Sequence, residues 1–127
     1  MLKNIKIIGF LFLFFLGQAL SGQALEKSLS NIMQKADVAT LANHLGETVT
    51  VNILDDEMQL SRQDAIAKIE SFFAANNPTA FSSKHSGKSK EGNTFVIGEY
   101  KSESTIYRTY FVLQNEKIQE FCIEEEE

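Results

Sequence analysis

Residues 105–113 read Thr-Ile-Tyr-Arg-Thr-Tyr-Phe-Val-Leu, and this stretch decides how the chain can fold. β-Branched and aromatic residues dominate it, as they do in β-strands. Side chains of a strand alternate between two faces. The two faces hold, respectively, Tyr107, Phe111 and Leu113, and Ile106, Tyr110 and Val112. A sheet with one face in water shows polar residues on that face, so the pattern predicts that both faces are covered.

Two arrangements would cover both faces of this strand. In the first, helices cover one face, and the other face closes over a cavity or meets a second subunit or another protein partner. In the second, a strongly curved sheet covers its own faces. The pattern leaves both arrangements open, and we expect a homodimer from the first.

The strand belongs to a series of strands that follows Pro78. Turn residues such as Lys90-Glu91-Gly92-Asn93 separate the strands of this series. Four strands are predicted in this part of the chain: Thr79–Ser89, Thr94–Lys101, Thr105–Leu113 and Lys117–Glu125. The first is polar, and its basic run consists of Lys84, His85, Lys88 and Lys90. Exposed lysines commonly protect the edge of a sheet from pairing, although such a run could also bind an anionic surface.

Helices are predicted in the N-terminal half, where apolar residues recur at helical spacing over Leu25–Ala36. Asp37 can cap a second, short helix that we expect to end at Gly46, since glycine often follows a helix C-terminus. A longer helix should begin after Ser61, which is followed three residues later by an aspartate, as in a capping box. It should stop at Asn76, because Pro78 follows closely.

One further strand is predicted at Thr48–Leu54, where polar and apolar residues alternate, with an acidic turn at Asp55-Asp56-Glu57. The predicted fold class is therefore α+β, with N-terminal helices packed on a strongly curved antiparallel sheet.

The first residues have the pattern of an export signal. Lys3 and Lys6 precede an apolar run at Ile7–Leu16, and small residues follow, so residues 1–22 are predicted to be a cleaved signal peptide. Residues 23–127 would form a single domain, periplasmic or secreted, with no membrane attachment after cleavage. The run is shorter than the roughly 20 residues that a membrane span needs.

Composition narrows the classes of function. The chain has 127 residues, a formal net charge of −5 and one cysteine. This acidic balance argues against nucleic-acid binding, which needs a cationic surface. Cys122 has no partner in its own chain, so we expect a small, buried side chain there; a disulfide between two subunits would require Cys122 to be exposed.

The order of elements resembles the nuclear transport factor 2-like superfamily, a cone-shaped α+β fold that is also described as cystatin-like. The resemblance rests on Leu45-Gly46-Glu47 leading into Thr48–Val51, on the helix Ser61–Asn76, and on residues 107–113 followed by Lys117-Ile118-Gln119-Glu120-Phe121. The chain also resembles a group of short exported bacterial proteins known only as a domain of unknown function.

The resemblance implies a pocket inside the cone, which some members use for catalysis and others for binding. Isomerase-like members place a carboxylate base near the end of the first strand, where the nearest residue here is Asn52. No carboxylate lies between Thr48 and Leu54, and the first helix lacks a tyrosine donor. That chemistry is therefore not expected in this chain, and we predict no catalytic residue.

A cluster of polar and aromatic residues on two neighbouring strands is the candidate ligand site: Tyr100, Tyr107, Arg108 and Tyr110. An arginine with tyrosine hydroxyls can hold a carboxylate or another anion. The alternative is ordinary sheet packing, with the stem of Arg108 lying on an aromatic ring.

We expect a noncatalytic exported domain that binds a small ligand in the cone or a protein partner on the sheet. The alternatives are a small acid/base enzyme of isomerase or lyase type, or a structural homodimer. His44 and His85 are the candidates for acid/base chemistry. They lack the spacing of a metal site, so no metal or cofactor is predicted.

Overall fold

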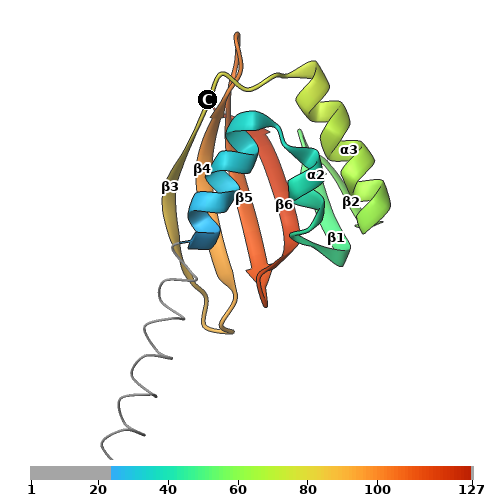
Figure 1. The fold of residues 1–127 in the computed structure, drawn as a ribbon, viewed down its shortest axis with the longest axis vertical. Helices are drawn as coiled ribbons and strands as arrows, with labels where there is room; N and C mark the ends of the chain where they lie inside the picture. The colour runs from blue at the N-terminus through green and yellow to red at the C-terminus, as the bar shows by residue number, and fades with distance from the viewer. Residues whose placement is uncertain (1–23, 127) are drawn as a thin grey trace, which may run out of the picture.

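The computed structural model describes residues 24–126, so the predicted signal peptide at residues 1–22 lies outside the described residues. A six-stranded sheet forms the body of the fold (Figure 1). Its strands are β1 (Leu45–Ile53), β2 (Asp56–Ser61), β3 (Ala80–Lys88), β4 (Thr94–Lys101), β5 (Ile106–Gln114) and β6 (Lys117–Glu125). The predicted ranges of the second and fourth strands of the C-terminal series, β4 and β6, are confirmed to the residue, and the α+β class is confirmed.

The strand order across the sheet is β2-β1-β6-β5-β4-β3. Neighbouring strands are antiparallel except β1 and β6, which pair in parallel, with Val51 beside Phe121 and Ile53 beside Ile123. The sheet is therefore mixed rather than purely antiparallel as predicted. The reason is topological: residues 54–116 separate β1 from β6, so no hairpin fixes their relative direction.

The predicted acidic turn at residues 55–57 is wrong in its position, because β2 begins within it. The turn lies at Leu54 and Asp55, whose φ values of 53° and 70° are left-handed, as in a tight two-residue hairpin turn. Asp56 and Glu57 already belong to β2, which pairs with β1. β2 is a short, polar edge strand, so its weak apolar alternation gives little signal in the sequence.

The helices lie on one face of the sheet (Figure 1). Residues 24–35 form the first described helix, and α2 (Val38–Ala42) follows, with Asp37 accepting a hydrogen bond from the backbone N–H of Thr40 as the predicted cap. The prediction that Gly46 ends this helix is wrong, because Gly46 lies in β1. The helix stops earlier because Leu45 is buried as a strand residue. None of the helices within residues 24–126 is both long and apolar enough to cross a membrane.

The helix α3 (Arg62–Ala75) confirms the predicted boundaries. The Ser61 side chain accepts a hydrogen bond from the backbone N–H of Asp64 at 3.3 Å, and Asn76 is the C-cap residue. α3 buries Ile69, Phe72 and Phe73 against the sheet. It therefore forms one of the two main covers of the sheet, and the helix at residues 24–35 forms the other.

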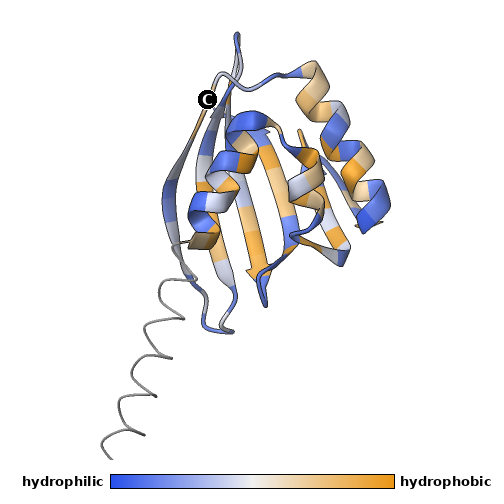
Figure 2. Cartoon of the chain, in the orientation of Figure 1, coloured by the Kyte–Doolittle hydropathy of each residue, from blue (hydrophilic) through white to orange (hydrophobic). Residues whose placement is uncertain are grey.

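The core lies between the helices and one face of the sheet, which we call the inner face; the opposite face is the outer face. The helices and the strands behind them both carry hydrophobic residues (Figure 2), and the helix residues Leu29, Met33, Ile69 and Phe73 are buried. The central buried residues include Leu29, Ile32, Met33, Phe111, Phe121 and Ile123. On β5, residues 107, 109, 111 and 113 are buried, whereas Ile106 and Tyr110 are exposed by 43% and 39%. The sheet therefore does not cover its own outer face, and in the single chain that face is open.

A carboxylate fastens the first helix to the edge of the sheet. Glu26 accepts hydrogen bonds from the Ser83 hydroxyl at 2.7 Å and from the Ser86 hydroxyl at 2.6 Å. The two serines flank an irregularity in the β3–β4 pairing between Ser83 and His85, which turns both hydroxyls toward the helix. The hydrogen bond from Ser86 has the larger effect and that from Ser83 the smaller, and both lower the pKa of Glu26 below its ordinary value of 4.5.

We predict that Glu26→Gln lowers the free energy of unfolding by about 1 kcal/mol near pH 7, because two hydrogen bonds to a charged, partly exposed acceptor are weakened. The folded pKa is depressed, so the wild-type stabilisation is present above the unfolded pKa and is lost as pH falls through the folded pKa. Urea unfolding should therefore show a difference between wild type and variant near pH 7 that shrinks toward about pH 3. Glu70→Gln, at an exposed position of α3, is the control; a difference that does not change with pH would contradict this role of Glu26.

Candidate functional site

The predicted cluster of tyrosines and arginine is divided between the two faces of the sheet. Tyr100 and Tyr107 are directly opposed on β4 and β5, and both point to the inner face, where they are 0% and 5% exposed. Arg108 and Tyr110 lie on the outer face of β5 and are exposed. The four residues therefore do not form one site, and each pair needs its own interpretation.

The inner pair is packed among aromatic rings. The ring centroids of Tyr100 and Tyr107 are 6.0 Å apart, and Phe72 lies 5.6 Å from the first and 5.2 Å from the second. Phe73 stacks on Tyr100 at 6.1 Å with an interplanar angle of 14°. This cluster fills the space between α3 and the sheet at the end of the cone where these strands meet the C-terminus of α3.

Both inner hydroxyls are bound to Asn76, the C-cap residue of α3. Tyr107 donates to the Asn76 side-chain oxygen Oδ1 at 2.8 Å, and Tyr100 donates to the Asn76 backbone carbonyl. Burial, with a smaller effect of Tyr107, raises the pKa of Tyr100, so this hydroxyl stays protonated and remains a donor. The inner tyrosines thus fasten the end of α3 to β4 and β5, and their donors are occupied.

The outer face carries an apolar patch that we call the outer patch: Phe95 and Ile97 on β4, Tyr110 and Val112 on β5, and Cys122 on β6. Strand pairing places these residues side by side, with Phe95 beside Val112, Ile97 beside Tyr110, and Tyr110 beside Cys122. Gly87 of β3 provides space for Phe95, because a Cβ at Gly87 would lie 2.9 Å from its ring. The result is a nearly continuous apolar surface on the side of the sheet that no helix within residues 24–126 covers.

Charged residues border the outer patch at one end. Glu99 lies directly opposite Arg108 across β4 and β5, and Arg108 lies opposite Glu124 on β6. The Arg108 guanidinium lies 3.8 Å from the Glu124 carboxylate. The Lys101 ammonium lies 3.6 Å from the Glu99 carboxylate. The order of charges across the strands is therefore acidic, basic, acidic.

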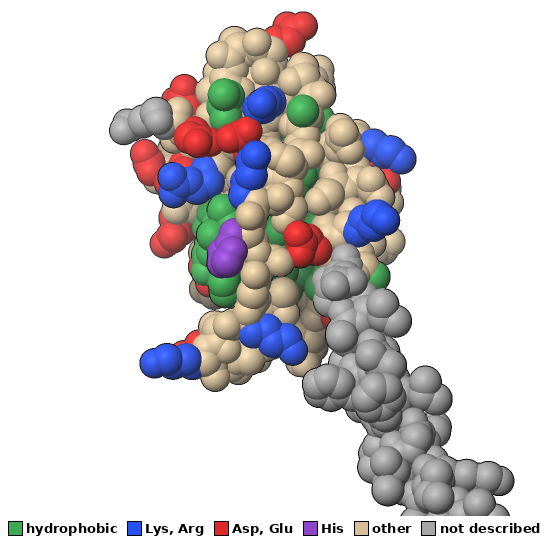
Figure 3. All heavy atoms as spheres, turned by 90° about the vertical axis from the view of Figure 1, so that its left-hand side faces the viewer, with side chains coloured by type: hydrophobic (Ala, Val, Ile, Leu, Met, Phe, Trp, Pro, Cys, Tyr) green, Lys and Arg blue, Asp and Glu red, His purple; other side chains and the backbone are tan. Residues whose placement is uncertain are grey.

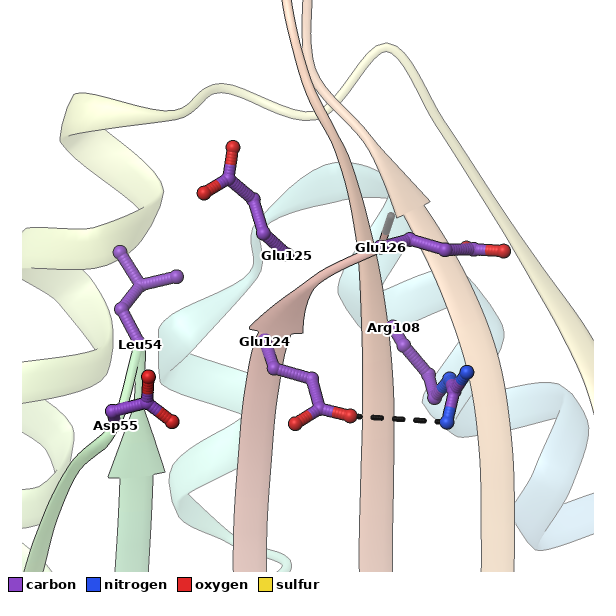
Figure 4. A pocket seen from close by; sticks show the side chains of 6 residues that line it. All are labelled: Leu54, Asp55, Arg108, Glu124, Glu125 and Glu126. Carbon is purple, nitrogen blue, oxygen red and sulfur yellow. Dashed lines mark ion pairs between the residues drawn. The ribbon is translucent and has the colours of Figure 1, made fainter.

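A surface cavity of about 550 Å³ lies beside this charged end and is lined by Leu54, Asp55, Arg108, Glu124, Glu125 and Glu126 (Figure 4). Its wall has four carboxylates and one guanidinium. Since the single cation already faces Glu124, the negative potential of this cavity disfavours the anion that the sequence pattern suggested for Arg108.

Cys122 lies at the β6 side of the outer patch, next to Tyr110, and is half-buried. Burial, together with the carboxylates of Glu120, Glu57 and Glu124, raises the pKa of the Cys122 thiol to about 11. A thiol with so high a pKa has little thiolate at neutral pH and is a weak nucleophile. The residue is therefore an apolar component of the patch, less deeply buried than the sequence predicts.

The two histidines lie far apart in the fold. His44 follows α2 and lines a surface cavity of about 330 Å³ together with Asn43 and Lys117. His85 is exposed on β3, and its ring lies 5.6 Å from that of Phe95, next to the outer patch. Within residues 24–126, no group of three or more side chains of the usual metal-binding types lies close enough to hold a metal ion.

The inner face of β1 also lacks an acid/base group. Asn52 is paired with Cys122 and so lies on the outer face, while Val51 and Ile53 are the buried residues on either side of it. The position where the resemblance would place a carboxylate base therefore presents apolar side chains to the interior.

The β3 edge of the sheet is basic. Lys84 and Lys88 are exposed on β3, and the view of this edge shows lysines along it and a histidine beside an apolar area (Figure 3). The basic run predicted from the sequence thus lies along one edge of the sheet, next to the outer patch.

Comparison with known proteins identifies the family. The family described as "Domain of unknown function (DUF4783)" matches residues 26–125. The crystal structure of a DUF4783 family protein from Bacteroides uniformis is similar, with a TM-score of 0.71 and 19% identity, over 80% of this chain and 96% of that chain. No curated protein matches the sequence.

Other solved structures confirm the fold. An NTF-2 like protein of unknown function from Silicibacter pomeroyi has a TM-score of 0.61 and 14% identity, over 87% of this chain and 98% of that chain. A protein with a cystatin-like fold from the same organism has a TM-score of 0.59 and 14% identity, over 78% and 71%. The resemblance to the nuclear transport factor 2-like superfamily is therefore confirmed for the fold.

We predict that the Tyr107 hydroxyl and the Asn76 side chain stabilise the fold together. Tyr107→Phe should lower the free energy of unfolding by about 1 kcal/mol, and Asn76→Ala by somewhat more, since it leaves a buried hydroxyl unpaired. In a double-mutant cycle measured by urea unfolding, the two changes should be coupled by about 1 kcal/mol. Tyr110→Phe on the outer face is the control and should have almost no effect. Additive effects of the two substitutions would contradict the pairing.

Proposed function

The chain belongs to the DUF4783 family, a domain of unknown function, and from this premise we propose that it is an exported, noncatalytic interaction domain. In this proposal, the outer face of its sheet binds a second copy of the chain. The single observation that carries the proposal is the outer patch, an apolar surface on a sheet face that the helices leave open.

The outer patch is unusual for a face that stays in water. An antiparallel region with one wet face normally shows polar residues there, and a contiguous exposed apolar surface marks an interaction site more often than scattered apolar residues do. Tyr110, at its centre, is 39% exposed. Burying such an aromatic side chain against a partner would contribute substantially to the free energy of association.

The alternatives have less support. A ligand in the cone would need several free polar groups there, but the hydroxyls of Tyr100 and Tyr107 are bound to Asn76, and Thr109 has the one buried side-chain oxygen without a partner within residues 24–126. An acid/base enzyme would need a free titratable group facing the interior, whereas the hydroxyls of Tyr100 and Tyr107 are bound to Asn76 and His85 is exposed on the outside. These features favour a surface interaction over chemistry or binding inside the fold.

Export is the second part of the proposal. The basic and apolar pattern of residues 1–22 is that of a signal peptide. The family match begins at residue 26, which is consistent with a leader that lies outside the conserved domain. We therefore propose that the mature domain lies in the periplasm or outside the cell.

We predict that Tyr110→Asp abolishes self-association. Sedimentation equilibrium of the mature chain, residues 23–127, should show a dimer whose population rises with concentration. The variant should have a dissociation constant at least about tenfold higher than wild type, because the new carboxylate would be desolvated in the contact between the copies.

The matched control for this experiment is Met58→Asp. Met58 is an apolar side chain of similar exposure, 42%, on the edge strand β2 and away from the outer patch. It should leave the dissociation constant unchanged. A wild-type chain that stays monomeric at concentrations near 1 mM, or a Tyr110→Asp chain that dimerises normally, would overturn the proposed function.

Export gives a separate prediction. When the full chain is expressed in a bacterium, mass spectrometry of the exported fraction should find a product that begins near Gln23. Phe12→Arg should keep the precursor inside the cell, because a charge interrupts the apolar run. Recovery of the intact 127-residue chain from the wild-type culture, with or without export, would contradict cleavage.

A further inference from the structure

We infer that the two copies pack about a two-fold axis that runs parallel to the strands and lies between β4 and β5, so that β4 of each copy covers β5 of the other. The inference rests on the proposed function, and it deepens that proposal by fixing which residues meet. It follows from the pattern of side chains on the outer face, row by row.

The outer faces of β4 and β5 form three rows of directly opposed residues: Phe95 with Val112, Ile97 with Tyr110, and Glu99 with Arg108. A two-fold axis midway between the strands, and parallel to them, exchanges the two members of every row. Each residue of β4 then lies over its own row partner in the second copy. Two rows bring apolar side chains together, and the third brings Glu99 over Arg108 twice.

Such self-complementarity is what a two-fold interface requires, since the same patch must fit itself. The apolar rows would lose contact with water. The Glu99 and Arg108 groups lie at the border of the patch, where opposite charges favour the correct orientation and suppress others. The charge pattern therefore selects an orientation that the apolar patch alone does not.

Other positions of the axis match the side chains less well. An axis along β5 places Arg108 over Arg108 of the second copy and Glu99 over Glu124. An axis perpendicular to the strands places the row of Phe95 over the row of Glu99. Both arrangements bring like charges together or cover charged groups with apolar ones, which is unfavourable.

An axis between β5 and β6 is the strongest competitor. It also pairs Arg108 with a carboxylate, that of Glu124. However, it places Val112 over Glu120 and, because β4 then covers β1, Ile97 over Asn52. The apolar row members would thus meet polar groups, so this axis buries less apolar surface than the axis between β4 and β5.

The flanking strands agree with the inferred axis. It places β6 of one copy over β3 of the other. The outer face of β6 carries Glu120 and Glu124. On β3, exposed His85 lies opposite Ile97 on the outer face, and exposed Lys84 lies next to it at the irregularity in the pairing. The inferred axis therefore brings the acidic strand β6 of one copy over the part of β3 that holds Lys84 and His85 in the other, and the two contacts are equivalent by symmetry.

The overlap of β3, β4, β5 and β6 sets the size of the contact. Strands about 4.8 Å apart and about 26 Å long give a flat area of roughly 500 Å² on each copy. The total of roughly 1,000 Å² lies at the lower end of specific interfaces. We therefore expect a reversible dimer with a dissociation constant in the micromolar range or above, which sedimentation must examine at high concentration.

A charge exchange tests the axis. Glu99→Arg places Arg over Arg108 of the second copy, and Arg108→Glu places Glu over Glu99. Each single substitution should raise the dissociation constant of the dimer at least about tenfold, and Glu99→Arg with Arg108→Glu should restore it to within about threefold of wild type. Urea unfolding confirms that each variant is folded.

The competing exchange is Arg108→Glu with Glu124→Arg, which should not restore dimerisation if the axis lies between β4 and β5. Restoration by this pair, or single substitutions that leave the dissociation constant unchanged, would overturn the inferred axis. Those outcomes leave the proposed function standing, provided that Tyr110→Asp still prevents association. A wild-type chain that does not associate, in contrast, fails the proposed function itself.

Discussion

The pairing register of β4 with β5 is the constraint on which the rest of the structure depends. It places Tyr100 opposite Tyr107 on the inner face, and Ile97 opposite Tyr110 on the outer face. A shift by one residue would move every side chain of β5 to the other face. The inner aromatic cluster would then reach water, and the end of α3 would lose both tyrosine donors. One register thus determines both the core and the composition of the exposed face.

Sequence patterns predict the parts of the fold that local physics decides. Ser61 and Pro78 bracket α3 by capping and by the restriction that proline imposes. Apolar and β-branched runs bounded by turn residues mark β4 and β6. β2 is missed because a polar edge strand buries too little to leave a pattern. The parallel pair of β1 and β6 is not predictable locally, since it depends on how the intervening helix and strands return the chain. Gly46 shows the same limit: burial of Leu45 overrides a local signal for a helix end.

The candidate site could be predicted only in part, for a related reason. Tyr100, Tyr107, Arg108 and Tyr110 do lie on neighbouring strands, as the sequence indicates. Their division between the faces requires the register. The role of Asn76 cannot be predicted from the sequence, because its partners Tyr100 and Tyr107 lie 24 and 31 positions further along the chain. The apolar outer face, however, is predictable, because residues 105–113 carry apolar side chains on both faces of the strand.

The two edges of the sheet limit how large an assembly can grow. β2 is short and polar, while β3 has an irregular pairing and exposed lysines, features that discourage the addition of further strands. In the proposed dimer, stacking through the outer face buries the outer patch of each copy, and the described helices cover the opposite face. Association of this kind closes on itself at two copies. The fold therefore combines a surface that favours pairing with borders that oppose growth into filaments or aggregates.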